Sequence, residues 1–403
     1  MRQLTKRTGA GVAAALVWAG LMAGLGGCGS GIGGSNGKPR APEEAIRVVP
    51  DDGAKGIGAN GKVEVHVPEG RRLEQVTVYS VTDGQREVLP GAVSADGLTW
   101  KPDGGRLALG SEYSVDAVAS DGDGHTLARH TTFTTFVPPH RFIGYFTPEN
   151  GSTVGTGMIL SFNFSHPVEN RQEVERAIRV TASPSVPVRG HWFGSSRLDF
   201  RPSAYWKPGT RVTVGMRLRD VQAAPGVYGT QRKTVGFRVG RSQVSRVDTA
   251  AHTMAVRRDG ALIATLPVTA GARKHTTYNG KMVVMEKRAV TRMNGRTVGF
   301  GGEYDIPDVP HAMRLTRSGT FLHGNYWASA RTFGAANTSH GCVGLRDVRG
   351  GSARTPAGWL FDHTLIGDVV EVVHSPDTRV APDNGLGGWN LNWSRWTSGS
   401  ALD

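Results

Sequence analysis

The chain has 403 residues but only two cysteines, Cys28 and Cys342. One pair so far apart in sequence excludes the multi-bridge framework of small secreted domains, and it excludes a zinc site built from four cysteines. Aromatic residues are also scarce, at 7%, whereas the chain has 56 glycines and 21 prolines. This composition favours short strands joined by many turns over helical bundles. The length is too great for one core and predicts several domains.

The N-terminal segment predicts the compartment. The apolar stretch from Gly9 to Met22 follows a basic start and is too short to span a membrane comfortably as a mature helix. It leads into Leu25-Gly26-Gly27-Cys28, which resembles the lipobox of bacterial lipoproteins. We therefore expect a signal peptide over 1–27 and a flexible tether over 28–43 with a lipidated Cys28. The lipid would hold the exported protein at the outer face of the cytoplasmic membrane, in the cell wall space. An ordinary secretory signal with an incidental cysteine is the alternative.

The net charge is positive, at +13. A basic chain can bind nucleic acid, anionic lipid headgroups or an acidic polymer such as the bacterial cell wall. No run of Lys and Arg interleaved with aromatic residues is present, and no zinc-finger spacing. Nucleic acid is therefore not expected among the partners.

A repeated pattern predicts two similar domains. The motif LTWKP at 98–102 returns as LDFRP at 198–202, an offset of about one hundred residues, the size of an immunoglobulin-like sandwich. Alternating apolar and polar residues support half-buried antiparallel strands in both segments. We expect immunoglobulin-like domains over 44–138 and 139–240. Their acidic and histidine residues have no triad or ligand spacing, so we interpret both domains as spacers.

The remainder predicts a third domain that is mostly β. A hairpin is expected around Asp259-Gly260, further short strands follow, and only Pro356–His363 has a helical composition. We place this domain at 241–374. A tryptophan-containing tail, 375–403, is expected to pack on it because of its large aromatic area. The predicted fold class is therefore mainly β: two tandem sandwiches, a β-rich catalytic domain and a short tail.

The chemistry depends on Cys342. If Cys28 is lipidated, Cys342 has no disulfide partner and remains a free thiol. A thiol becomes a strong nucleophile as the thiolate, which requires a nearby base or positive field. His323 and His340 are the candidate neighbours. One cysteine beside a histidine is the minimal set for acyl transfer through a thioester, and we expect the sulfur to be held as an anion near an imidazole.

The motif His323-Gly324, followed by Ser339-His340-Gly341-Cys342-Val343, resembles the signature of the L,D-transpeptidase (YkuD-like) catalytic domain. The resemblance covers about residues 247–374. The two preceding sandwiches and the tail resemble the multi-domain, membrane-anchored members of that family. It implies a cysteine acyltransferase that needs no cofactor and no metal.

The resemblance also implies roles for the site residues. The donor would be a peptidoglycan tetrapeptide stem, attacked by Cys342 at its third residue with loss of the terminal D-alanine. His323 would be the general base, oriented by the backbone carbonyl of Gly324. The backbone around His340, Gly341 and Cys342 would form the oxyanion hole. An amine of a neighbouring stem would then complete a 3→3 cross-link, and carbapenem β-lactams would acylate the same thiol.

Contacts with the substrate are implied for four further residues, each with ordinary packing as its alternative: Met293, Tyr304, Trp327 and Ser339. One departure from the family pattern is Gly344, where most members have Asn or Arg. This departure removes a polar side chain near the site, so it leaves recognition of the substrate carboxylate and the choice of acceptor open, but not the nucleophile. No role is assigned to His311.

Three other interpretations compete with the transpeptidase. His323, His340 and Cys342 are zinc-type ligands, but the sequence offers no fourth ligand at structural-zinc spacing. Sortases are also exported, β-rich cysteine acyltransferases, but they lack the Ser-His-Gly-Cys motif. The third alternative is a cell-wall-binding structural lipoprotein with a decayed active site.

Overall fold

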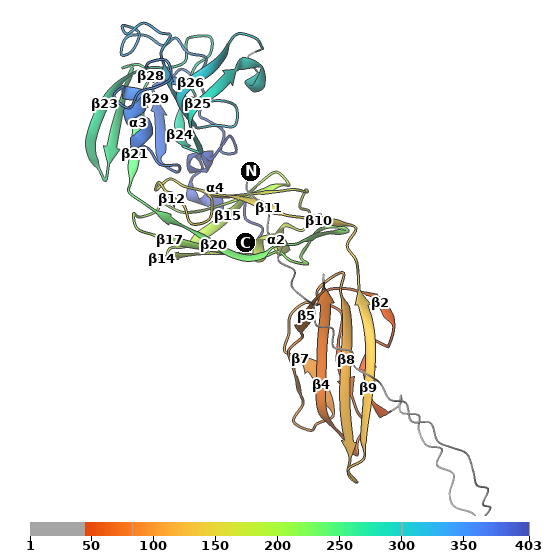
Figure 1. Ribbon diagram of the computed structural model, residues 1–403. Helices are drawn as coiled ribbons and strands as arrows, with labels where there is room; N and C mark the ends of the chain where they lie inside the picture. Colours follow the sequence, from red (N-terminus) through yellow and green to blue (C-terminus); the bar gives the residue numbers. More distant parts are fainter. Residues whose placement is uncertain (1–44, 83, 300, 403) are drawn as a thin grey trace, which may run out of the picture.

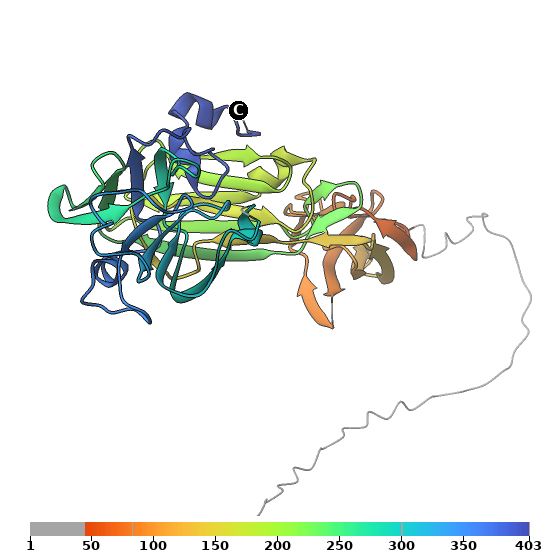
Figure 2. The ribbon, with the colours of Figure 1, turned by 90° about the horizontal axis from the view of Figure 1, so that it is seen from above.

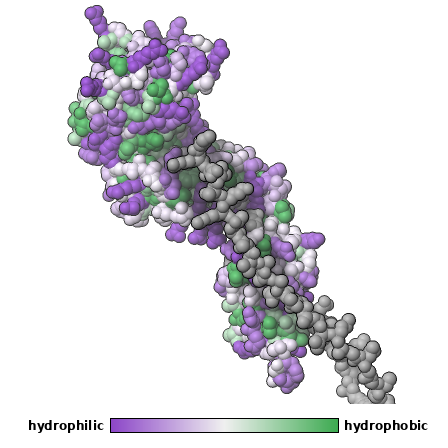
Figure 3. All heavy atoms as spheres, in the orientation of Figure 1, coloured by the Kyte–Doolittle hydropathy of each residue, from purple (hydrophilic) through white to green (hydrophobic). Residues whose placement is uncertain are grey.

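The computed structural model describes residues 45–402 except 83 and 300. Strands make up 47% and helices 8%, which confirms the predicted mainly-β fold class. Figure 1 shows three β-rich units in sequence order along an elongated molecule, and Figure 3 shows mostly hydrophilic residues on the visible surface. Cys28 lies outside the described residues. Among those that are described, no helix has the length and apolar character required to cross a membrane.

The first unit is a sandwich of two sheets, with strand orders β1-β3-β7-β6 and β2-β9-β8-β4-β5. Apolar residues that alternate along the strands meet between the sheets, where Trp100 is buried and Tyr113 stacks on Phe133 at 5.0 Å. Its strands are β1 (Arg47–Val49), β2 (Ala54–Ile57), β3 (Glu64–His66), β4 (Arg71–Thr82), β5 (Gln85–Val88), β6 (Gly91–Val93), β7 (Thr99–Pro102), β8 (Glu112–Asp121) and β9 (Thr126–Thr135).

The second unit is also a sandwich, with sheets β11-β13-β16-β15 and β12-β20-β17-β14 and a small sheet β10-β19-β18 at one end. Trp192 and Trp206 are buried in its core. Its elements are β10 (His140–Phe142), β11 (Gly144–Thr147), β12 (Thr153–Val154), β13 (Leu160–Phe164), α2 (Arg171–Arg176), β14 (Ile178–Ser183), β15 (Val188–Phe193), β16 (Arg197–Pro202), β17 (Arg211–Arg217), β18 (Gln222–Ala224), β19 (Val227–Gly229) and β20 (Arg232–Val239).

The third unit carries the candidate site on one sheet, ordered β24-β29-β21-β22-β23-β28-β27-β26-β25. Asp259 and Gly260 both have positive φ, so the predicted hairpin is a tight two-residue turn between β22 and β23. The elements are β21 (Gln243–Asp248), β22 (Thr253–Arg258), β23 (Ala261–Thr269), β24 (Gly280–Val283), β25 (Glu286–Asn294), η1 (Gly295–Val298), β26 (Asp305–Arg314), β27 (Phe321–Asn325), β28 (Val343–Arg346), α3 (Pro356–His363) and β29 (Val369–Val373).

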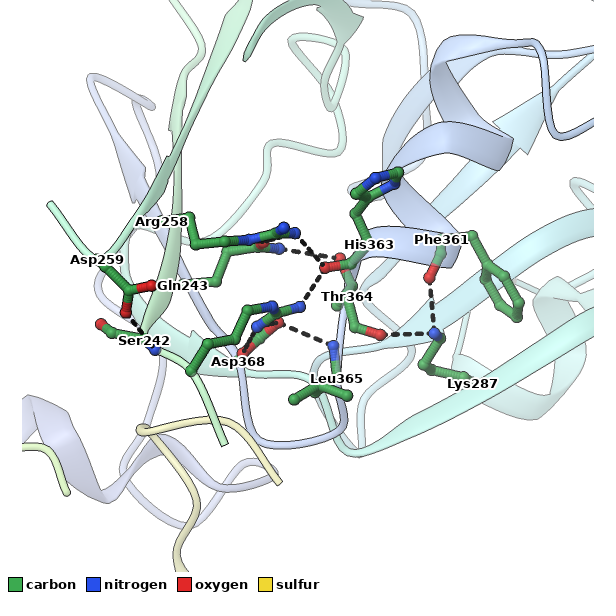
Figure 4. Close-up of polar contacts among 11 residues, drawn as sticks. Ser242, Gln243, Arg258, Asp259, Lys287, Phe361, His363, Thr364, Leu365 and Asp368 are labelled. Atoms are coloured by element: carbon green, nitrogen blue, oxygen red, sulfur yellow. Dashed lines mark hydrogen bonds and ion pairs between the residues drawn. The ribbon is translucent and has the colours of Figure 1, made fainter. Parts of the chain in front are cut away.

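The single helix predicted for this unit is confirmed as α3. Its N-terminus has a capping residue, since the Thr355 hydroxyl accepts a hydrogen bond from Gly358 N, and Pro356 occupies the first turn. Leu360 packs into the core beneath the sheet. After the helix, Lys287 donates to the carbonyls of Phe361 and Thr364 at 2.6 Å each (Figure 4), so the helix end is tied to β25.

The segment after α3 joins this unit to the second sandwich. Asp368 accepts two hydrogen bonds from Arg241 at 2.9 and 3.0 Å, and Arg258 donates to the His363 carbonyl (Figure 4). Gly155 N, in the second sandwich, donates to Ile366 O at 2.8 Å. The third unit is therefore fixed on the sandwich by backbone contacts as well as by side chains.

The C-terminal tail packs differently from the prediction. It was expected to pack on the catalytic domain, but only its first half, up to η2 (Gly387–Asn390), contacts that domain, through Asn279 and Lys281. The last helix, α4 (Trp393–Thr397), lies against the second sandwich (Figure 2). The reason is that the sandwich offers an apolar and cationic surface that the tail tryptophans complete.

Arg201 of β16 is the centre of that surface. Its guanidinium lies 4.6, 5.4 and 4.4 Å from the rings of Trp389, Trp393 and Trp396, and burial lowers its pKa to about 10. Trp396 is fully buried and donates from Nε1 to Arg189 O at 3.0 Å. The tail therefore bridges the two domains.

Replacing Trp396 by alanine tests this bridge. We expect Trp396→Ala to lower the free energy of unfolding by about 3–5 kcal/mol, because it leaves a cavity and exposes Arg201. Urea denaturation measures the change. The matched control is Trp393→Ala, which removes a half-buried ring and should cost clearly less; equal losses would contradict the bridging role.

Candidate active site

Two parallel strands bring the candidate nucleophile and base together. β27 pairs with β28 so that Leu322 lies opposite Val343 and His323 opposite Gly344. Leu322 and Val343 both point into the core. Because side chains alternate, His323 and Cys342, which directly precedes Val343, lie on the other face of the sheet. Residues separated in sequence thus become diagonal neighbours on one surface.

His323 is held in one orientation. Its Nδ1–H donates to the carbonyl oxygen of Gly324 at 2.9 Å, so Nε2 carries the lone pair of the neutral ring. Trp327 stacks on the imidazole at 5.7 Å between ring centres and is itself 44% exposed, so it forms a wall of the site. Burial lowers the pKa of His323, against the opposing effects of the Gly324 bond and the Asp347 charge.

Gly324 permits a close approach of the chain behind this histidine. A Cβ atom at position 324 would lie 2.1 Å from Asp347 Oδ2 and 2.8 Å from the Pro310 ring. Asp347 is buried and accepts hydrogen bonds from His311 Nδ1 at 2.7 Å and from Thr355 Oγ1 at 2.9 Å. Sequence reasoning missed Asp347 and gave His311 no role, since nothing in their spacing links them to the motif.

Cys342 is a free, buried cysteine whose Sγ–H donates to Gly319 O at 3.4 Å. Burial raises the pKa of its thiol to about 11, and the Phe321 backbone and Arg314 lower it only in part. Burial therefore disfavours the resting thiolate that we expected from the sequence. Desolvation disfavours both charged forms, so the resting pair is a thiol beside a neutral imidazole.

The loop before Cys342 is braced on both sides. The Ser339 hydroxyl donates to Cys342 O at 2.5 Å, and the Ser339 backbone bonds to Ala270 O at 3.0 Å and Ala272 N at 2.8 Å. Gly341 adopts φ +102°, a conformation that favours glycine. The structure thus places Ser339 as a brace of the nucleophile loop.

The lid hairpin, residues 286–299 and 301–314, contacts the nucleophile loop from one side. It consists of β25, η1 and β26. Met293 is buried in a small cluster with Val309 and Ala312, against which the half-buried Tyr304 packs. The Tyr304 ring lies 5.1 Å from that of His340, and burial, with smaller effects of Cys342 and Glu303, raises its pKa to about 12. Met293 is thus part of the lid core, whereas Tyr304 faces the nucleophile loop.

A group of three side chains joins the lid to the nucleophile loop. Glu303 Oε2 lies 3.0 Å from His275 Nε2 and 3.1 Å from His340 Nε2, and the two imidazoles stack at 5.0 Å. Their ligand atoms lie within 4.8 Å of one another and could hold a divalent cation. Among the described residues, no such group includes Cys342, so the zinc set His323, His340 and Cys342 does not assemble.

The space beside Gly344 is already occupied. A Cβ at this position would lie 3.0 Å from Thr269 Cγ2 and 3.4 Å from the Asn325 amide nitrogen. Asn325 is buried on the neighbouring strand, and its Oδ1 accepts from Ala328 N at 2.9 Å. The Asn325 amide of β27 therefore lies beside the position where the family pattern led us to expect a polar side chain on β28.

Comparison with known proteins gives consistent matches. The family model for a bacterial Ig domain matches residues 54–222, and that for the L,D-transpeptidase catalytic domain matches residues 242–372. "L,D-transpeptidase 2" of Mycobacterium tuberculosis (strain CDC 1551 / Oshkosh) is 31% identical in an alignment 403 residues long. The alignment covers 96% of this chain and 94% of that protein. "L,D-transpeptidase 5" of Mycobacterium tuberculosis (strain ATCC 25618 / H37Rv) is 28% identical, covering 90% and 78%.

Solved structures are also similar. A structure of an L,D-transpeptidase in complex with imipenem has 31% sequence identity to this chain, covers 59% of it and 100% of its own chain, and gives a TM-score of 0.49. The relative named L,D-transpeptidase 2 is 31% identical to this chain and covers 96% of it. The chain therefore belongs to the L,D-transpeptidase family.

Proposed function

We propose that this protein is a peptidoglycan L,D-transpeptidase that forms 3→3 cross-links between stem peptides through a thioester on Cys342. The observation that carries the proposal is the placement of Cys342 and His323 on one face of adjacent strands, with His323 Nδ1–H fixed on Gly324 O at 2.9 Å. That bond leaves Nε2 as a base for the thiol, in the way a histidine activates a nucleophile when a third group orients it.

Acylation begins from the neutral pair. As the donor carbonyl approaches, Nε2 of His323 takes the thiol proton and the sulfur attacks the carbonyl carbon of the third stem residue. The N–H groups around Gly341 and Cys342 stabilise the developing oxyanion. The tetrahedral intermediate then expels D-alanine, whose leaving nitrogen receives the proton from His323. Gly324 O stabilises the transient imidazolium.

Deacylation uses the acceptor. An amine from a neighbouring stem loses a proton to His323 and attacks the thioester, which releases the Cys342 thiol and forms the amide cross-link. Trp327, which is exposed and stacked on His323, and Tyr304, beside the nucleophile loop, form the walls along which the stems lie. Lipidation of Cys28 would keep the enzyme at the outer face of the cytoplasmic membrane, next to the wall.

Carbapenems are proposed as inhibitors of the same site. A β-lactam presents a strained amide carbonyl that the Cys342 sulfur can attack, with ring opening in place of D-alanine departure. The competing interpretation is a wall-binding structural lipoprotein whose site has decayed. Intact-mass spectrometry after meropenem distinguishes them, because only an active thiol gains the mass of the drug.

Removing either member of the pair should abolish activity. Cys342→Ala and His323→Ala should each form no 3→3 cross-linked muropeptides from disaccharide-tetrapeptide, as measured by mass spectrometry, while melting as cooperatively as the parent. His125→Ala, which changes an exposed histidine of the first sandwich, is the control and should retain full activity. Cross-linking by either site variant would contradict the mechanism.

The raised pKa of Cys342 predicts an unusual pH profile. Alkylation of the free enzyme by iodoacetamide should accelerate up to a pH of about 11, because the buried thiol retains its proton. At pH 7 it should be at least about tenfold slower than in the urea-unfolded chain, whose cysteine titrates near 8.5. The raised pKa of Cys342 also affects the free energy of unfolding. Its stabilising contribution is fully present below the pKa of the unfolded cysteine and is lost as the pH rises towards 11. A rate that levels off below pH 8 would instead indicate a resting ion pair.

The shared core limits which fragments should fold. Trp389 and Trp396 of the tail and Val283 of the catalytic domain belong to one buried cluster with the second sandwich. A fragment that starts at residue 139, without the first sandwich, should therefore acylate with meropenem at the parent rate. A fragment that starts at 241 should unfold at lower urea concentration, because that core is exposed. Equal stability of the two fragments would contradict this.

A further inference from the structure

One face of the second sandwich carries arginines in register. Side chains on β14, β17 and β20 alternate between the core and solvent. The solvent-facing positions contain no acidic residue; they are Arg179, Thr181, Ser183, Arg211, Thr213, Gly215, Arg217, Arg232, Thr234, Gly236 and Arg238. We call its five arginines, at 179, 211, 217, 232 and 238, the arginine face. All five are exposed.

The pairing of these arginines is unfavourable in the isolated protein. Arg217 lies directly opposite Arg232, and Arg211 directly opposite Arg238, in the antiparallel pair of β17 and β20. Like charges at directly opposite positions destabilise a sheet. Within the described part of the chain, none of the five has an acidic partner. The residues between them are threonines and glycines, which are small and leave the guanidinium groups accessible.

The face also forms one wall of a cleft between the two sandwiches. The cleft has a volume of about 1110 Å³ and includes Arg179, Arg217 and Arg232, with Lys233 on the same sheet and Arg106 from the first sandwich. Figure 1 shows β14, β17 and β20 on the side of the second sandwich away from the catalytic domain.

Acidic residues balance only part of this charge. The cleft contains Asp220 and Glu87, and Asp220 is bound at 2.7 Å by Arg141 outside the cleft. Arg106 pairs with Glu173 at 3.0 Å. The groups that can bind a ligand in the cleft are therefore the arginines of the sheet, Arg179, Arg217 and Arg232.

We propose that the arginine face and this cleft bind a carboxylate-bearing strand of peptidoglycan, as a second site separate from the catalytic thiol. The proposal rests on the proposed function, because it assigns the same polymer to both sites. Guanidinium groups bind carboxylates through two parallel hydrogen bonds, and stem peptides present carboxylates repeatedly along the polymer. The two arginine pairs are six residues apart on β17, roughly 20 Å, so the face suits an extended ligand and not a single small anion.

A second site changes what the sandwiches do. Two sites for one polymer on one chain raise the effective concentration of wall near the catalytic thiol without any new contact there. The sandwiches are then part of substrate capture, in addition to being spacers.

The test measures binding of the full chain to purified peptidoglycan stripped of phosphodiester polymers. Sedimentation is performed in a Cys342→Ala background at low salt, so that no turnover occurs. The triple variant R179Q/R217Q/R232Q should weaken binding about tenfold or more. The matched control R47Q/R246Q/R354Q removes three exposed arginines elsewhere and should bind like the parent. Parent binding should also be lost when the peptidoglycan carboxylates are amidated.

A second variant distinguishes a loss of binding from a loss of folding. Arg232→Glu places an acid opposite Arg217, so it should raise the melting temperature at low salt while it weakens binding. Equal binding by the triple variant and its control would overturn the proposal. So would binding of the parent only to walls that retain phosphodiester polymers.

Carbapenem acylation of Cys342 separates this inference from the proposed function. In the native-cysteine background, the arginine variants should acylate at the parent rate. If the arginine variants bind the wall like the parent and acylate normally, the second site alone is refuted. If the parent chain never acylates, the proposed function is refuted.

Discussion

The pairing of β27 with β28 places a thiol and an imidazole on the same buried surface, and the remainder of the site depends on it. Burial opposes charge on both groups: it raises the pKa of Cys342 to about 11 and lowers that of His323. The Gly324 carbonyl fixes the ring without adding a charged third residue. The result is a neutral pair in which the proton moves from the thiol to the imidazole only during the reaction, as the sulfur attacks the substrate carbonyl.

The surrounding structure keeps this pair in place from three directions. Ser339 braces the nucleophile loop, Asp347 lies behind the histidine, and Glu303 links the lid hairpin to His275 and His340. Further away, the tail tryptophans around Arg201 fix the catalytic unit on the second sandwich. A rigid link of this kind would allow polymer bound on the arginine face to be presented to the site.

Local patterns predicted much of this architecture. Alternation and the Asp259-Gly260 turn indicated the strands and hairpin, and the helix was found at Pro356–His363 as expected. The thiol–histidine motif lies within a short stretch of sequence, so its residues could be named before their geometry was known. The resting protonation state could not be predicted, because it depends on how deeply the folded structure buries the thiol. Asp347 and Glu303 were missed because only the folded sheet brings them to the site, and the tail was misplaced because Arg201 gives no sign in the sequence of its three aromatic neighbours.

The neutral resting pair is tested most directly by ¹⁵N NMR of the His323 imidazole in the free, full-length enzyme at pH 7. The account predicts a neutral ring protonated at Nδ1, with Nε2 unprotonated, and no change when Cys342 is replaced by alanine. An imidazolium with protons on both nitrogens, lost on removal of the sulfur, would show a resting thiolate ion pair and contradict it.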